Sequence, residues 1–381
     1  MSRIPVMNLF LGCLVLLAWA PKILLGDLVE RRAGGTAIEG DIRQIDQSGV
    51  QIRDANAVLH IVPWDRIRDV KMMYPDPRLN ELLPIADELW RARTRLERGD
   101  RALAEPIFAR MFAKTIGNNH ETALMVAEGL LRVRLARGAH AAAVIPMLEV
   151  IRLQRAGIAT DSFSTLPELF EEVNQGELLC VQLAPFFVRN NDLERLVKAL
   201  DSYESLGDDY VERLAQIYKL AAEATLYNDG STLESAQSRS QNFIEEAINI
   251  RWQTDAGGSK RSLRAVDELE ERVDDLPSWA RMWLLYALGM QKTQWSDLGG
   301  RDRGLVQLAT VASVQSDQFA YLAGMALQSL ADVLEEDGQL TAAASLRREL
   351  ESQMPRHPIQ QEIPPLQRAV IESEEPQEEP Q

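Results

Sequence analysis

The stretch from Leu327 to Pro355 constrains the fold of this chain most strongly, because an apolar pattern, a turn and a stop signal agree there. Apolar residues recur three and four positions apart on both sides of Gly338, which is the spacing of one face of a helix. They are Leu327, Leu330, Ala331 and Leu334, then Ala342, Ala343, Leu346 and Leu350. Pro355 ends the second run, because proline lacks a main-chain donor and clashes with the preceding turn. We therefore expect two antiparallel helices that pack on a further layer.

This hairpin resembles a tetratricopeptide repeat. Such a repeat has a small residue in its first helix, a glycine at the turn, an alanine five residues later and a closing proline. The corresponding residues are Ala331, Gly338, Ala343 and Pro355. Arg347 and Leu350 depart from the family pattern, which usually has an aromatic and a small residue there. The resemblance implies helical-hairpin packing and carries no catalytic residue.

Helical patterns extend over residues 82–357 and predict an irregular tetratricopeptide-like array, an α-solenoid. The turn glycines Gly99 and Gly138 lie 39 residues apart. The predicted helices before the hairpin at 327–355 are 82–98, 102–116, 122–137, 139–155, 192–206, 208–227, 233–252, 263–273, 279–291 and 304–314. Prolines and glycines interrupt segment 156–192, where we expect short helices.

Residues 27–73 have a different pattern, in which short alternating apolar runs are separated by turns. They predict about five strands and a small antiparallel β-barrel. The order of strands and turns resembles that of small Sm-like barrels. Trp64 precedes the last strand and is expected to plug the barrel mouth. Residues 74–81 contain Pro75 and Pro77 and predict a linker, because two close prolines fit neither a strand nor a helix interior.

The N-terminal residues 1–26 predict a signal peptide or an uncleaved anchor. Arg3 precedes an apolar run from Val6 to Ala20, which has the length of a signal-peptide core and is short for a stable membrane span. We expect an exported protein, periplasmic or in the cell envelope, with inner-membrane anchoring as the alternative to cleavage. Without this segment Cys180 is the only cysteine, and its apolar neighbours predict a buried thiol.

The charge distribution argues against nucleic acid as a ligand. The chain has 41 basic and 57 acidic side chains, a net charge of −16. An acidic surface repels phosphate backbones. Residues 358–381 are rich in proline, glutamate and glutamine, and they predict a disordered acidic tail.

No motif indicates catalysis, a cofactor or a metal. The histidines, which are His60, His120, His140 and His357, lack the spacing of a zinc motif. The glycine-rich run from Gly299 to Gly304 lacks the lysine and hydroxyl residue of a phosphate loop, and it predicts a loop between helices.

Two functions fit these observations. The first is a non-catalytic cell-envelope scaffold or adaptor that binds a protein or peptide partner, because the chain resembles cell-envelope tetratricopeptide-like proteins of planctomycete-type bacteria. The second is an envelope hydrolase or sugar-processing enzyme on an all-helical toroid, with a tryptophan-lined pocket beside Asp255 or Asp297. The tryptophans are Trp252, Trp279, Trp283 and Trp295.

An arginine-rich segment supplies the predicted partner-binding residues, because the first helix of each hairpin lines the inner surface of a solenoid. These residues are Arg91, Arg95, Arg98, Arg134 and Arg137, accompanied in sequence by Arg93 and Arg132. They predict an acidic partner, of which the chain's own tail from Glu372 to Glu379 is one example. Membrane contact is expected only through an uncleaved N-terminal segment, and the sequence leaves the oligomeric state open.

Overall fold

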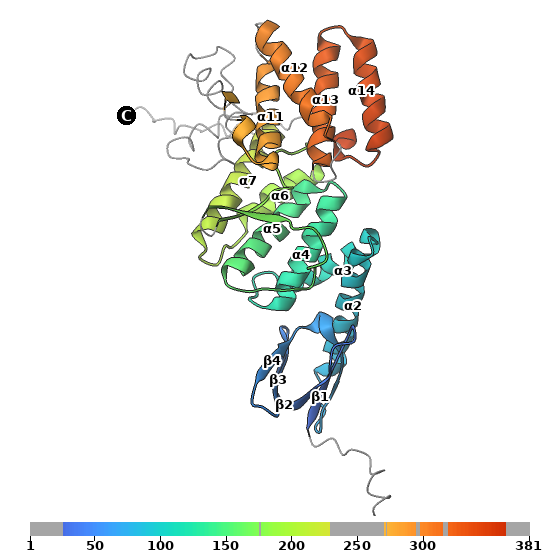
Figure 1. Cartoon of the computed structure of the whole chain (residues 1–381), viewed down its shortest axis with the longest axis vertical. Coiled ribbons are helices and arrows are strands. Elements are labelled where there is room, and N and C mark those ends of the chain that lie inside the picture. Colours follow the sequence, from blue (N-terminus) through green and yellow to red (C-terminus); the bar gives the residue numbers. More distant parts are fainter. Residues whose placement is uncertain are drawn as a thin grey trace, which may run out of the picture. The chain divides into compact units, whose positions relative to one another are not determined.

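The computed structural model describes residues 26–174, 177–228, 270–271, 273–294, 298–314 and 319–362. This part of the chain is mostly helical and has an antiparallel sheet near its N-terminus (Figure 1). It forms two compact units, divided between Thr94 and Arg95. The predicted N-terminal segment up to residue 25, the helix 233–252, most of the helix 263–273 and the tail beyond residue 362 lie outside the described residues. Among the helices that are described, none is long and apolar enough to cross a membrane.

The first unit contains one five-stranded antiparallel sheet. Its strands are β1 (Asp27–Arg31), β2 (Ile38–Asp46), β3 (Gly49–Asp54), β4 (Leu59–Val62) and β5 (Ile67–Lys71), in the spatial order β4-β3-β2-β1-β5. The predicted strands are confirmed, but the expected barrel is wrong because the sheet is open, with β4 and β5 as its edges. In a closed barrel every strand pairs with two neighbours in a staggered register. β4 is only four residues long, so it offers few main-chain groups for a second neighbour.

Trp64 belongs to the core of this unit. It begins the 3₁₀ turn η1 (Trp64–Arg66) between β4 and β5. Trp64 is 1% exposed, and its indole Nε1 donates a hydrogen bond of 2.8 Å to the carbonyl of Asp46. The tryptophan is therefore buried as expected, within an open sheet rather than at a barrel mouth.

Helix α2 (Leu79–Glu97) crosses the division between the two units. The Arg93 guanidinium lies 2.6 Å from the carboxylate of the fully buried Asp65, and Arg32 of the sheet region bonds to Asp87 of α2 at 3.1 Å. Arg32 also lies over the Trp90 ring at 4.8 Å. These contacts hold the first part of α2 on the sheet. The division consequently falls inside a helix and not at the expected linker 74–81.

The second unit begins with five helices and a two-stranded hairpin. The helices are α3 (Arg101–Thr115), α4 (Glu121–Ala136), α5 (His140–Arg155), α6 (Asn191–Asp201) and α7 (Asp209–Tyr227). Helix α3 packs on α4, α4 on α5, and α5 on both α6 and α7. The predicted hairpin around Gly138 is confirmed as α4 and α5.

Segment 156–192 corrects the expectation of short helices. It forms the antiparallel hairpin β6 (Phe170–Asn174) and β7 (Glu177–Cys180). The buried residues Phe170, Leu179 and Cys180 join the core beside α5 and α7, so strand pairing satisfies main-chain groups that would otherwise be buried without partners. Cys180 is 0% exposed, as predicted, and burial raises the pKa of its thiol to about 12.

In the later described residues of this unit, four helices lie in consecutive contact: α11 (Ser278–Lys292), α12 (Leu298–Ala312), α13 (Ala320–Glu336) and α14 (Leu340–Gln353) (Figure 1). The hairpin predicted around Gly338 is confirmed as α13 and α14. Its predicted apolar face is buried at Leu330, Ala331, Ala343 and Leu350, whereas Ala342 is exposed. Short 3₁₀ turns lie at each end of this part, η2 (Val273–Asp275) and η3 (Pro358–Gln361). The predicted tail begins at residue 358, so its first residues are part of η3 and of the folded structure.

The glycine-rich run corrects the prediction of a loop, because Gly299 to Gly304 lie within α12. Gly304 packs against Gly289 of α11, and a Cβ added at Gly304 would lie 3.0 Å from the Gly289 carbonyl oxygen and 2.8 Å from the Thr293 nitrogen. Glycine therefore serves here to let two helix backbones approach closely.

Candidate functional site

Three of the five predicted partner-binding arginines contact α3. Arg95 donates a hydrogen bond of 3.3 Å to the Leu103 carbonyl at the start of α3. Two residues further along α3, Glu105 accepts from Arg137 at 2.8 Å and lies 3.7 Å from Arg134, both near the end of α4. We define Arg95, Glu105, Arg134 and Arg137 as the arginine surface.

The other arginines of the segment lie elsewhere. Arg91 pairs with Asp87 one turn earlier on α2, in the first unit. Arg98 is exposed in the turn that follows α2. Arg93 pairs with the buried Asp65, and Arg132 pairs with Glu128 at 2.7 Å. Neighbouring arginines in sequence thus have different environments, which helical spacing alone does not reveal.

The arginine surface carries an excess of positive charge. Its two α4 guanidinium groups converge on the single carboxylate of Glu105. Arg134 is largely buried, with 22% of its side chain exposed, and also donates to the Ala142 carbonyl at 2.5 Å. Burial lowers the pKa of Arg134, against the effect of Glu105, yet an arginine stays protonated at neutral pH. Arg137 is half exposed, so its charge is available to a ligand.

The exposed Leu103 does not share a face with these charges. It is 56% exposed but lies two residues before Glu105 in α3, so the two side chains point to opposite sides of the helix. The guanidinium groups around Glu105 can bind acidic groups of a ligand.

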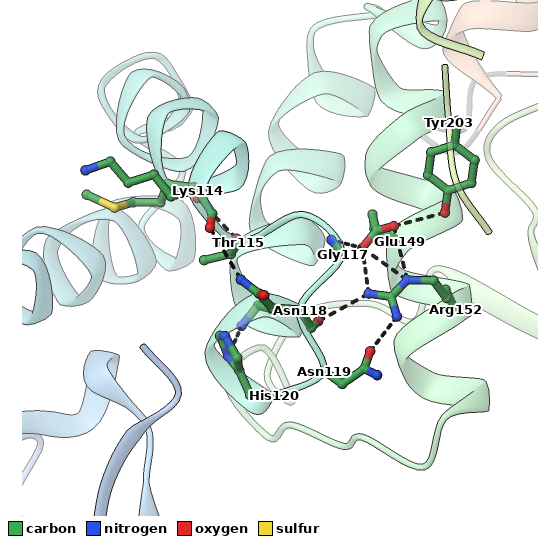
Figure 2. Close-up of polar contacts among 11 residues, drawn as sticks. Lys114, Thr115, Gly117, Asn118, Asn119, His120, Glu149, Arg152 and Tyr203 are labelled. Atoms are coloured by element: carbon green, nitrogen blue, oxygen red, sulfur yellow. Dashed lines mark hydrogen bonds and ion pairs between the residues drawn. The ribbon is translucent and has the colours of Figure 1, made fainter. Parts of the chain in front are cut away.

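A second polar cluster surrounds the buried ion pair of Glu149 and Arg152 in α5 (Figure 2). The Arg152 guanidinium donates to Asn119 Oδ1 at 2.5 Å and to the Asn118 carbonyl at 3.2 Å. The Glu149 carboxylate accepts from the Gly117 backbone N–H at 3.2 Å and from the Tyr203 hydroxyl at 3.0 Å. The pair is therefore hydrogen-bonded to the loop between α3 and α4 and stabilises its position against α5.

The chemistry of this cluster indicates a structural role. Both carboxylate oxygens of Glu149 accept hydrogen bonds from Arg152 as well as from a second donor. Burial, followed by the Glu149 charge, raises the pKa of Tyr203 far above its ordinary value. The Tyr203 hydroxyl is therefore not arranged to exchange a proton with a substrate near neutral pH. This cluster has little signal in the sequence, where Glu149 and Arg152 simply lie three residues apart in a mostly apolar helix.

A third cluster joins two histidines to Tyr321 of α13. The His140 ring stacks on the Tyr321 ring with centroids 3.5 Å apart, and His357 Nε2 lies 2.8 Å from the Tyr321 carbonyl oxygen. The Tyr321 hydroxyl accepts from the Val188 N–H at 3.1 Å. A Cβ added at Gly324 would meet the His357 ring at 2.5 Å, so the absence of a side chain there creates the space for His357. Burial lowers the pKa of His140 to about 3 and that of His357 to about 4.

Two of the clustered tryptophans are core residues. Trp279 and Trp283 are 5% and 1% exposed and contact each other edge to face at 5.2 Å. Trp279 Nε1 also donates to Glu171 at 2.7 Å. Their burial removes both from any substrate-binding surface. Trp252, Trp295, Asp255 and Asp297 lie outside the described residues.

Within the described ranges, no group of three or more His, Cys, Asp or Glu side chains could hold a metal ion. Comparisons with known proteins give no assignment: no protein-family model, no curated protein and no solved structure matches this chain.

Proposed function

We propose that this protein is a non-catalytic scaffold that binds an acidic protein or peptide partner through the arginine surface. The observation that carries the proposal is the convergence of Arg134 and Arg137 on the single carboxylate of Glu105. The hydrogen bond from Arg134 to the Ala142 carbonyl holds the Arg134 guanidinium in place before a ligand binds. Such preorganisation reduces the entropy lost on binding.

The proposal includes an architecture and a compartment. Consecutive packing from α3 to α5 and from α11 to α14 supports an irregular α-solenoid. The apolar run after Arg3 supports export to the cell envelope. In this view the helices provide a rigid support and the partner supplies the biological activity.

Fluorescence anisotropy with a labelled peptide of residues 372–381 tests the binding site. The protein is the full chain with its five glutamates from Glu372 to Glu379 changed to glutamine, so that the tail does not compete. Reversing Arg95 and Arg137 to glutamate should weaken binding about tenfold at ~50 mM salt, because each exposed charge contact contributes roughly 0.5–1 kcal/mol. The difference should shrink at ~0.5 M salt.

Arg195→Glu provides the matched control. Arg195 is 78% exposed on α6 and pairs with Asp192 on the same helix. It should leave binding within twofold of the parent, and so should Leu103→Ser, because the Leu103 side chain points away from Glu105. Equal affinities for the parent, the double reversal and the control would exclude the arginine surface as a site for an acidic peptide.

A further inference from the structure

The two edges of the open sheet in the first unit differ in how their main-chain groups are used. In the part of the chain that the structure describes, β4 pairs only with β3, and β5 pairs only with β1. An edge strand exposes unpaired N–H and C=O groups that can bind another strand, unless charges or side-chain contacts block them.

The β5 edge is blocked. Its exposed positions include Arg68 and Lys71, and Lys71 pairs with Glu30 of β1 at 2.5 Å. The Asp69 carboxylate accepts from the Val70 backbone N–H at 2.9 Å, and Arg32 Nε donates to the Ile67 carbonyl at 2.8 Å. Another strand would have to displace these contacts and approach charged side chains.

The β4 edge has none of these protections in the described structure. Its sequence is LHIV, without lysine, arginine, proline or acid. Val58, Leu59 and Ile61 are 50%, 48% and 56% exposed. Leu59 lies opposite Arg53, and Ile61 lies opposite Gln51, on the solvent face of the sheet. Apolar residues on this face of an edge strand are unusual, because natural edges are normally charged.

The register identifies which β4 groups point outward. Asp54 N–H donates to the Val58 carbonyl at 3.0 Å where the β3–β4 turn closes. Hydrogen-bonded and non-bonded pairs alternate along an antiparallel ladder. The pairs Ile52–His60 and Val50–Val62 are therefore the bonded ones, and the N–H and C=O groups of Leu59 and Ile61 face away from β3.

We propose that β4 pairs antiparallel with β4 of a second copy of this chain, about a two-fold axis at His60. Leu59 of each copy then exchanges both main-chain hydrogen bonds with Ile61 of the other, and the two His60 residues form the central non-bonded pair. The four residues of β4 include no lysine, arginine or acid, so self-pairing brings no such charges together, and each His60 Nε2 lies 2.9 Å from Asp54 Oδ2 of its own copy.

The size of the contact predicts a reversible dimer. A strand of four residues buries far less than the roughly 1,600 Å² of a stable complex. Association should therefore depend on protein concentration. It involves the sheet and is independent of the arginine surface, so either proposal can fail without the other.

Cysteine crosslinking in the full chain tests the register. The background is Cys13→Ser with Cys180→Ala, which removes both native cysteines. Upon mild oxidation, His60→Cys should give a covalent dimer, because residues at the two-fold axis lie about 4.5 Å apart between Cα atoms, within disulfide range. Leu59→Cys alone should give at least fivefold less, but an equal mixture with Ile61→Cys should give the mixed dimer.

Arg68→Cys on the β5 edge is the matched control for random collision. Equal crosslinking at positions 59, 60 and 68 would overturn the proposal. Sedimentation equilibrium of the full chain supplies a second measurement, in which Ile61→Lys should raise the dimer dissociation constant at least tenfold. If the parent is monomeric at every concentration while its Leu59 and Ile61 amides resist hydrogen exchange, another segment of the same chain covers β4 and the proposal is wrong.

Discussion

Glu149 and Arg152 form an ion pair inside α5, 2.8 Å between Oε2 and Nη2, with only 2% and 4% of their side chains exposed. Such a pair is costly to break, because the remaining partner keeps a buried charge without compensation. Arg152 also holds Asn118 and Asn119 (Figure 2). The pair therefore connects the stability of α5 to the loop that precedes α4.

Removal of one member of this pair should be more damaging than removal of both. Arg152→Met should lower the free energy of unfolding by about 3–5 kcal/mol, and the Glu149→Leu/Arg152→Met double variant should recover most of that loss. Tyr203→Phe should cost only about 1 kcal/mol, because it removes one hydrogen bond from a carboxylate that keeps its others. Urea unfolding followed by circular dichroism provides the measurement, and additive single and double effects would contradict the ion-pair interpretation.

Acidification should destabilise the second unit through His140 and His357. Their folded-state pKa values, about 3 and about 4, lie below the ordinary value of 6.5. Stability is thus highest above pH 6.5 and declines as the unfolded chain takes up protons between pH 6.5 and pH 4. At pH 5 each histidine should cost roughly 2 kcal/mol relative to pH 7.5.

The His357→Gln variant isolates one of these contributions. It should be less stable than the parent at pH 7.5, because the contacts of the imidazole with Tyr321 and Ile359 are altered. Its loss of stability between pH 7.5 and pH 5 should nevertheless be smaller by roughly 2 kcal/mol. Parallel stability curves for parent and variant would show that His357 titrates alike in the folded and unfolded states.

Charge reversal should destabilise the protein strongly at one arginine of α2 and hardly at another. Arg93→Glu should unfold the sheet unit, because it places a second acid beside the buried Asp65. Arg91→Glu should change stability by less than about 1 kcal/mol, since Arg91 is 57% exposed and pairs with Asp87 on its own helix. Thermal unfolding followed by circular dichroism distinguishes them, and similar melting temperatures for the two variants would contradict the different environments of Arg93 and Arg91.

The close approach of α11 and α12 should tolerate no side chain at Gly304. Gly304→Ala should destabilise the second unit by about 1–3 kcal/mol, because its Cβ would overlap the α11 backbone near Thr293. Gly299→Ala, on the exposed first turn of the same helix, should be neutral or slightly stabilising because alanine favours helix. Equal effects of the two substitutions would mean that the helices can separate without cost.

The sequence predicts the local elements of this fold better than their tertiary environment. The hairpins around Gly138 and Gly338 could be predicted because apolar spacing and turn glycines act within a few residues. The β6–β7 hairpin could not, because its strands are stabilised by burial beside α5 and α7 rather than by a clear alternating pattern. The run from Gly299 looked like a loop because glycine composition does not indicate that a second helix requires the space.

The candidate site shows the same limit. The arginine-rich segment is visible in the sequence, but the environments of its members are not. Arg93 pairs with Asp65, which is distant in sequence, and Arg137 pairs with Glu105 on another helix. Glu149 and Arg152 have the spacing of an ordinary exposed pair. Only the packing of α4, α6 and α7 around α5 turns that pair into a buried one.

The hydrogen bond between Val188 and Tyr321 connects residues 133 positions apart, and this separation affects how the protein is made. A simple repeat array can fold one unit after another as the chain leaves the ribosome. Here the aromatic contact of His140 must wait until Tyr321 has been synthesised. Such long-range contacts slow folding, because a long loop must close before they form. The earlier helices therefore spend part of biosynthesis without their last partner, and in that period a chaperone would be needed most.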